Sequence, residues 1–198
     1  RFYDPTHGSI RLGDGRQQVD LRQVEQQALR HPIGVVTQQV QLFNASVRDN
    51  LTLFDDQIED DIILDSLREV GLSDWLAELP NGLDSHLAAD GALSAGEAQL
   101  LAFTRVFLAD PKLIILDEAS SRLDPATEQL IEKALDKLLR NRTAVIVAHR
   151  LATVQRADEI MILDNGRILE HDRREALVAN PNSQFSQLLK TGLEEAFA

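Results

Sequence analysis

The stretch from Leu93 to Asp124 reads LSAGEAQLLAFTRVFLADPKLIILDEASSRLD, and it decides the fold. A serine and a glycine stand in front of an apolar helical pattern, which ends at the turn Asp110-Pro111. The chain then runs through the apolar segment Leu113–Leu116 into two acids. A helix that leads through a short turn into an apolar strand is the repeating unit of α/β sheets. We therefore expect a mostly parallel sheet flanked by helices.

Two neighbouring acids, Asp117 and Glu118, follow the strand Leu113–Leu116 directly. A strand made only of apolar residues is expected to be buried on both faces of a parallel sheet. Open α/β sheets bind ligands at the carboxyl ends of their strands. In such a place one carboxylate can hold Mg²⁺, and the next can orient or deprotonate a water molecule. Ordinary solvated acids at a strand end are the alternative, and the pair taken alone does not decide between the two.

Three further features around the acids favour a site. Leu93–Glu97 begins a helix whose first N–H groups can bind phosphate, although a plain capped helix start has the same pattern. Asp124 precedes Pro125, which suits the first position of a helix, so a capping role is expected in any case. His149 ends the apolar strand Ala144–Ala148 and is expected beside the acids, where an imidazole can hydrogen-bond a phosphate. A lone histidine there is more often structural, so the combination carries the argument.

The rest of the chain alternates between strand and helix patterns. The expected strands are Ser9–Leu12, Gln18–Leu21, Ile33–Thr37, Leu113–Leu116, Ala144–Ala148, Glu159–Leu163 and Arg167–Glu170. The expected helices are Leu21–His31, Asn44–Leu51, Glu59–Val70, Trp75–Leu79, Glu97–Leu108, Pro125–Arg140, Arg174–Val178 and Ser183–Leu189. Asn44 or Ser46 is expected to cap the second helix, and Gly71 to end the third. We expect a helical subdomain over about 46–108 and the remaining α/β core over 109–198.

Composition excludes several classes of protein. The chain has 198 residues, of which 43% are apolar, enough for a real core. Its net charge of −12 opposes binding to the phosphate backbone of nucleic acids. The absence of cysteine excludes disulfides and thiolate metal sites. No apolar run approaches the ~18 residues of a membrane helix, so another segment would have to provide any membrane span.

With these motifs in place, the chain resembles the nucleotide-binding domain of ATP-binding-cassette (ABC) transporters over nearly all of its length. It looks most like the exporter-type subfamily. That closer likeness is carried by RFYDPTHGSI at 1–10, IGVVTQQVQLFNASVRDNL at 33–51 and HRLATV at 149–154. The resemblance implies an α/β, P-loop NTPase-like ABC ATPase fold with a helical subdomain. It also implies that residues 1–198 form a truncated domain, and that the cofactors are ATP and Mg²⁺.

The resemblance assigns four residues to the chemistry of ATP hydrolysis. Asp117 matches the Walker B aspartate, a ligand of Mg²⁺, and Glu118 matches the catalytic glutamate. Gln38 matches the Q-loop glutamine, which reaches both Mg²⁺ and the attacking water. His149 matches the switch histidine.

The resemblance also implies contacts with a nucleotide held by a second domain. Ser94 and Gly96 match the signature motif, which contacts the γ-phosphate of ATP on the opposite domain. The usual motif is Leu-Ser-Gly-Gly-Gln, so Ala95 and Glu97 are departures within it. We expect a working but weaker contact, because Glu97 brings negative charge close to a phosphate. Asp124 matches the D-loop aspartate at the interface of the two domains.

The phosphate-binding loop of this family is missing from the sequence. No glycine is followed by lysine, so the pattern G-x-x-x-x-G-K-[ST] is absent. We therefore expect that this chain alone neither binds nor hydrolyses ATP. It is either a part of a longer transporter or a stand-alone truncated domain, and the start without methionine favours the first reading.

The expected function is ATP hydrolysis that powers an export transporter at the cytoplasmic face of the inner membrane. The expected partners are a second nucleotide-binding domain and the coupling helices of a transmembrane domain, contacted near Leu87–Gly91. Nucleic acid is not expected as a partner. The alternative is a non-catalytic interaction module, or a donor of the signature motif to the ATP of a partner. The net charge of −12 opposes a third reading, an ABC-type ATPase of DNA repair or translation.

Overall fold

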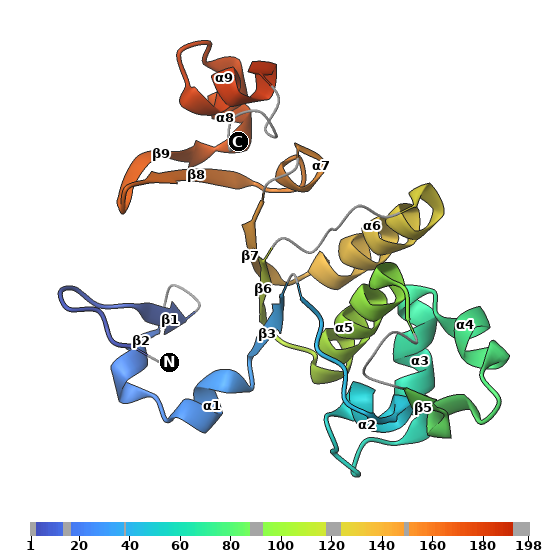
Figure 1. Cartoon of the computed structure of the whole chain (residues 1–198). Helices are drawn as coiled ribbons and strands as arrows, with labels where there is room; N and C mark the ends of the chain where they lie inside the picture. Colours follow the sequence, from blue (N-terminus) through green and yellow to red (C-terminus); the bar gives the residue numbers. More distant parts are fainter. Residues whose placement is uncertain are drawn as a thin grey trace. The chain divides into compact units, whose positions relative to one another are not determined.

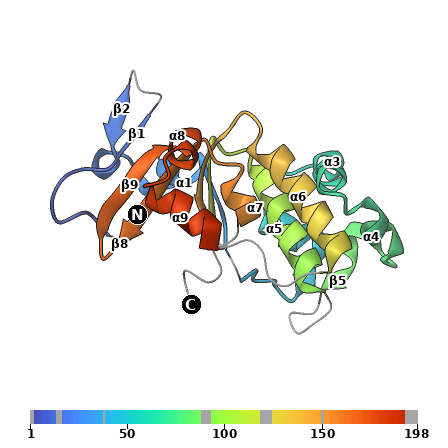
Figure 2. The ribbon, with the colours of Figure 1, turned by 90° about the horizontal axis from the view of Figure 1, so that it is seen from above.

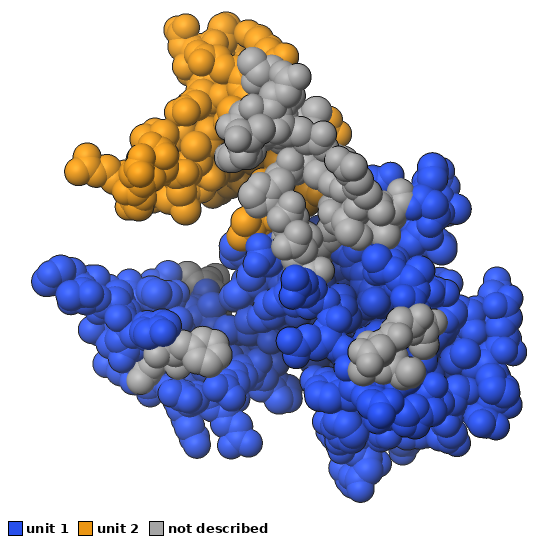
Figure 3. Space-filling view, in the orientation of Figure 1, with its two compact units in different colours: residues 1–145 blue, residues 146–198 orange. Residues whose placement is uncertain are grey.

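The computed structural model describes residues 3–13, 17–37, 39–87, 93–117, 124–148 and 151–191 (Figure 1). The chain divides into two compact units, Arg1–Val145 and Ile146–Ala198, which Figure 3 shows in different colours. Within the described residues, no helix combines the length and the apolar character needed to cross a membrane. The two units are described one after the other.

The first unit is built on a parallel sheet. β3 (Ile33–Val36) and β6 (Leu113–Asp117) pair in parallel, with Ile33 opposite Leu113 and Val36 opposite Leu116. β7 (Thr143–Val147) completes the order β3-β6-β7 and extends across the boundary between the units. These three strands agree with the predicted strands to within one residue at each end.

Two long helices stand before and after β6 in the chain. They are α5 (Ala95–Ala109) and α6 (Pro125–Leu139), which pack side by side (Figures 1 and 2). α5 also contacts β3, and Gly34 makes this contact close. A Cβ added to Gly34 would lie 2.7 Å from both Pro111 Cγ and Val106 Cγ1. Only a glycine therefore lets the helix approach the strand this closely.

Part of the core of the first unit lies between the sheet and α5, and the rest lies between α5 and the helices α2 (Val47–Thr52), α3 (Asp60–Val70) and α6. Val36, Ile114 and Leu116 are each at most 1% exposed. Leu101 and Phe103 of α5 are fully buried as well. Gly34 faces α5. Val36 lies on the same covered side, because alternate residues of a strand share a face.

The other face of the sheet is more open than the sequence predicts. Leu113 and Ile115 of β6 are only half-buried. In β7 the exposed fractions are 53% for Val145 and 47% for Val147. The expected burial of the strand Leu113–Leu116 on both faces is therefore wrong, because Leu113 and Ile115 are only half-buried. An apolar run shows that a strand is favoured, but it does not show what packs against each face.

Three shorter helices lie between β3 and α5. They are α2 (Val47–Thr52), α3 (Asp60–Val70) and α4 (Ser73–Glu78). Of the two predicted caps of α2, Ser46 is the one used, since its Oγ accepts a hydrogen bond from the Asp49 N–H at 3.0 Å. Gly71 ends α3 as predicted, with a left-handed φ of 83°. These helices occupy the range predicted as a helical subdomain, 46–108, whose boundaries stay a prediction.

Short elements fasten the start of α2 to the turn beyond α4. β4 (Ala45–Ser46) pairs antiparallel with β5 (His86–Leu87), and η2 (Gly82–Asp84) is a single 3₁₀ turn. The Val47 N–H also donates to the Ser85 carbonyl at 2.9 Å. The beginning of α2 is therefore held by backbone hydrogen bonds from a segment far along the chain.

The N-terminal region differs from its prediction in one element. A hairpin of β1 (Arg11–Gly13) and β2 (Gln18–Asp20) is followed by η1 (Leu21–Gln23) and α1 (Gln26–Arg30). The single helix expected over Leu21–His31 is wrong, because the backbone is extended at Val24. The Asp20 carboxylate accepts from the Arg22 N–H and side chain, which stabilises one isolated turn and lowers the pKa of Asp20 to about 2.

The second unit is a hairpin covered by helices. β8 (Glu159–Asp164) and β9 (Arg167–Arg173) pair antiparallel, and they are accompanied by α7 (Leu151–Val154), α8 (Arg174–Ala179) and α9 (Gln184–Thr191). Asn165 and Gly166 form the turn with φ values of 47° and 74°, which suits a two-residue hairpin loop. The core of this unit consists of Val154, Leu177 and Phe185. The predicted hairpin and closing helices are confirmed.

Candidate functional site

The N-terminus of α5 is closed by a reciprocal capping box. The Ser94 Oγ accepts a hydrogen bond from the Glu97 N–H at 3.2 Å, and the Ser94 N–H donates to Glu97 Oε2 at 2.7 Å. A serine followed three residues later by glutamate is the sequence pattern of this motif. The helix end predicted to contact phosphate is therefore already ordered by its own side chains.

Ala95 and Gly96 are the first two residues of α5. Ala95 is exposed, whereas Gly96 is buried. Because Ala95 lies inside the helix, it has an ordinary right-handed backbone that any residue adopts, and its methyl group causes no strain. The replacement of a glycine by Ala95 is therefore compatible with a formed signature helix.

Glu97 changes the electrostatics of this helix end. Its carboxylate oxygen takes the Ser94 N–H, a donor that a phosphate oxygen could otherwise use. A phosphate at that N–H must displace the carboxylate, and the two anions repel each other. The Ser94 hydroxyl accepts from the Glu97 N–H and retains its own proton as a donor. The geometry thus permits a phosphate contact and weakens it.

Asp117 is the last residue of β6, and its side chain is exposed. The preceding residue, Leu116, is buried, and it lies opposite Val36 at the end of β3. The chain leaving β3 is turned by a hydrogen bond from Thr37 Oγ1 to the Gln39 carbonyl at 2.9 Å. The carboxylate therefore stands at the carboxyl end of a parallel strand, where α/β sheets bind ligands.

Asp124 caps α6. Its Oδ1 accepts from the N–H groups of Ala126 at 3.1 Å and Thr127 at 3.0 Å, and Pro125 takes the first helical position. Hydrogen bonds from Thr127, and then from the backbone of Ala126, hold the pKa of Asp124 below its usual value. The predicted capping role is confirmed, and a role at an interface between domains stays a prediction.

The structure describes only some of the predicted site residues. Gln38, Glu118 and His149 lie outside the described residues. Among those described, Ser94, Asp117 and Asp124 stand on separate elements, and no hydrogen bond or ion pair joins them to one another. In the same part of the chain, no group of three or more His, Cys, Asp or Glu could hold a metal ion.

Sequence reasoning missed an exposed aromatic pair beyond Gln38. Phe43 and Phe54 meet edge to face with ring centroids 5.3 Å apart. The exposed fraction is 43% for Phe43 and 58% for Phe54. Phe54 and its neighbour Leu53 have φ values of 68° and 54°, which are unfavourable for bulky residues. Nothing in the sequence pattern signals this conformation.

A second missed residue is Arg105 on α5. It is half-buried, and it donates hydrogen bonds to α2 and to the segment before it. Here a signal was available, because Arg105 is the one basic residue within AFTRVFLA, residues 102–109.

Comparison with known proteins decides the family. The family model described as ABC transporter matches residues 1–121. Over 198 residues the chain is 40% identical to the mycobactin import ATP-binding/permease protein IrtA of Mycolicibacterium smegmatis, covering 100% of this chain and 22% of that protein. The chain belongs to the ABC transporter family.

Two further relatives match over most of this ABC chain. The probable multidrug resistance ATP-binding/permease protein YheH of Bacillus subtilis is 39% identical over 180 residues, with 90% of this chain and 26% of that protein covered. The ATP-dependent lipid A-core flippase of Alcanivorax borkumensis is 36% identical over 197 residues, with 98% and 33% covered. This ABC chain therefore spans between 22% and 33% of the length of these relatives.

A solved structure confirms the predicted fold. The structure of a bacterial Atm1-family ABC exporter with ATP bound matches with a TM-score of 0.82 at 30% identity, over 96% of this chain and 33% of that chain. The chain thus has the α/β ABC ATPase fold, with a parallel sheet flanked by helices. It is homologous to the ATP-binding domains of exporter-type ABC proteins.

The described residues fit the cofactors expected of an ABC domain. For ATP, which the family binds, the Ser94 hydroxyl and the first N–H groups of α5 are donors of the kind that phosphate needs. For Mg²⁺, Asp117 offers an exposed carboxylate, and oxygen is the ligand that this ion prefers. A single carboxylate suits Mg²⁺ bound to nucleotide, since the ion keeps several waters.

Proposed function

We propose that this ABC chain is the ATP-hydrolysing domain of an exporter-type transporter, and that it powers the movement of a substrate across a membrane. Asp117 and Gln38 would hold Mg²⁺ on the nucleotide, where the ion would supply positive charge beside the phosphates. Glu118 orients or deprotonates the attacking water. His149 hydrogen-bonds the terminal phosphate.

One observation carries the proposal. The exposed carboxylate of Asp117 ends a parallel strand that is buried on one face, in a chain whose fold matches an ATP-bound exporter. Glu118 follows it directly in the sequence, as the proposed roles require.

The signature end of α5 is assigned to a second nucleotide. We propose that Ser94, Ala95, Gly96 and Glu97 contact ATP held by another nucleotide-binding domain, identical or different. Asp124 then lies at the interface between the two domains. The capping box supports this role, because it leaves the proton of the Ser94 hydroxyl available to a phosphate oxygen.

A transmembrane domain is the proposed partner at the cytoplasmic face of the membrane. Two relatives of this chain join ATP-binding and permease parts in one protein, as their names state. We propose that Leu87–Gly91 and the exposed side chains of Phe43, Leu53 and Phe54 contact it. Asp55 and Asp56 follow the aromatic pair, which favours a contacting segment with basic residues.

The test of this function is the variant Glu118→Gln in the transporter that carries the domain. ATP turnover should fall by about 100- to 10,000-fold, the usual contribution of a positioned acid or base, while binding of ATP persists. Phosphate release in lipid vesicles and nucleotide binding by calorimetry measure the two properties. Glu175→Gln on α8 is the matched control and should leave turnover unchanged. Normal turnover in the Glu118 variant would contradict the catalytic assignment.

The second candidate function is a signature donor without hydrolysis of its own. It is favoured by the absence of a Gly-Lys pair in this chain together with the intact helix end at Ser94. We expect calorimetry of the chain alone with Mg-ATP to show no binding. Binding that appears only on mixing with an intact partner domain supports donation, whereas micromolar binding by the chain alone would overturn this expectation.

A further inference from the structure

The side chain of Arg105 joins three segments of the first unit. Its Nε donates to the Asn50 carbonyl of α2 at 2.7 Å, and its Nη1 donates to the Gln41 carbonyl at 2.9 Å. A longer contact of 3.4 Å runs from Nη2 to Asn50 Oδ1. Arg105 itself belongs to α5, the helix that begins at Ser94. One guanidinium therefore links the segment after Gln38, α2 and α5.

Asn50 completes this arrangement from within α2. The residue is fully buried. Its Oδ1 accepts from the Phe43 N–H at 2.8 Å, and its Nδ2 donates to the carbonyls of Phe43 at 2.9 Å and Ser46 at 3.0 Å. The segment 41–46 is thus fixed to α2 by one amide side chain and to α5 by one guanidinium.

The charge of Arg105 is not needed for these contacts. Among the described residues its acceptors are neutral oxygens, and burial lowers the pKa of its guanidinium from the ordinary value. A buried cation without an anionic partner is unfavourable compared with an apolar side chain of similar size. What an apolar residue cannot provide is a rigid fork of donors aimed at two segments at once. The arrangement is therefore explained by geometry and not by stability.

We propose that Arg105, together with Asn50, is a positioning clamp that makes segment 41–46, α2 and α5 move as one body, so that a displacement beside Gln38 reaches Ser94. α5 carries the displacement from Arg105 to Ser94 over about 16 Å along its axis. The role of Ser94 rests on the proposed function, but the clamp is tested without nucleotide. Failure of the clamp and failure of the proposed function therefore give separate results.

The test measures the distance between the two ends of the clamp. The chain contains no cysteine, so spin labels can be placed on Asn44→Cys and Ala95→Cys, both at exposed positions of the full chain. Pulsed electron paramagnetic resonance then gives the distribution of label distances. In Arg105→Met the distribution should become roughly twice as broad, because the hydrogen bonds that join the segment to α5 are lost. Circular dichroism checks that the helices persist.

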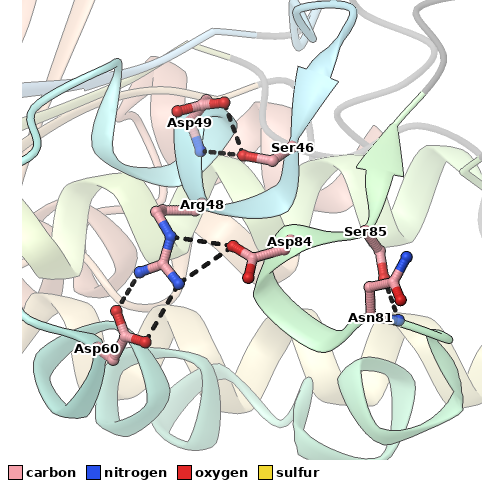
Figure 4. A network of polar contacts seen from close by, with 7 residues as sticks. All are labelled: Ser46, Arg48, Asp49, Asp60, Asn81, Asp84 and Ser85. Atoms are coloured by element: carbon pink, nitrogen blue, oxygen red, sulfur yellow. Dashed lines mark hydrogen bonds and ion pairs between the residues drawn. The ribbon is translucent and has the colours of Figure 1, made fainter.

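A matched control removes another half-buried arginine, which lies on α2. Arg48 of α2 forms ion pairs with Asp60 and with Asp84, the latter at 3.2 Å, as Figure 4 shows. Arg48→Met should leave the distribution unchanged. If Arg105→Met does not fold, Arg105→Lys decides, since it keeps the charge and loses the fork. A distribution as narrow as that of the parent chain in a folded Arg105 variant overturns the clamp.

Discussion

Two neighbouring valines of β3 have opposite surroundings. Val36 is 1% exposed and shares its face with Gly34, against which Val106 and Pro111 pack. Val35, one residue earlier, is 53% exposed on the other face. Both belong to one apolar strand, so the difference arises from what lies on each face and not from the strand itself.

The comparison shows which part of the sheet holds the first unit together. The face toward α5 is close-packed, and a single added carbon at Gly34 would collide with two side chains. The opposite face keeps apolar residues that are exposed or half-buried, among them Val35 and Ile115. Apolar surface of this kind favours association with another surface. Stability and solubility of the chain should therefore depend on different faces.

The largest effect is expected from a truncation on the covered face. Ile114→Ala should lower the free energy of unfolding by about 2–5 kcal/mol, because it leaves a cavity beside α5. Urea unfolding followed by circular dichroism measures this change. Val35→Ala is the control on the open face, and equal losses from the two variants would remove the distinction between the faces.

A smaller effect is expected from overfilling the covered face. Gly34→Ala should destabilise the chain by about 1–3 kcal/mol, since Pro111 and Val106 must move to admit the methyl group. The same urea experiment measures it. Combination with Val106→Ala makes room for the added carbon and should be less destabilising than the sum of the single changes. Strict additivity would show that the helix does not lie against Gly34.

The smallest effect is expected on the open face. Val35→Thr keeps the shape of the side chain and should change the free energy of unfolding by about 0.5 kcal/mol or less. The same substitution at Val36 buries a hydroxyl and should be destabilising by about 1–3 kcal/mol. Light scattering should also show that Val35→Thr aggregates less than the parent chain. A large loss from Val35→Thr would mean that this face is packed in solution.

Much of the fold could be predicted from local patterns. α3 follows from helical spacing and a terminal glycine, and the β8–β9 hairpin follows from the turn Asp164-Asn165-Gly166. The helix expected over Leu21–His31 failed because a local ion pair at Asp20 and Arg22 favours a single turn. The expected burial of β6 on both faces failed because an apolar run favours a strand but does not determine what packs against each face.

Two local features of the candidate site were predictable in a similar way, and the roles of its residues stay predictions. The caps at Ser94 and Asp124 depend on residues within one helical turn, so the spacing of these residues predicts them. The partners of Arg105 could not be predicted from local spacing, since Asn50 and Gln41 lie 55 and 64 residues away in the sequence. Contacts over such separations depend on how the helices pack, and a short sequence pattern does not predict this packing.

The closed box at Ser94 has a consequence for the entropy of binding. A helix end that already holds its own first turn loses little conformational freedom when a ligand arrives. A phosphate that binds here would take the place of the Glu97 carboxylate at a surface that is already ordered. No disordered segment would have to become ordered first. Contact and release at this end would then need little reordering of the chain, which fits the proposed contact with a second nucleotide.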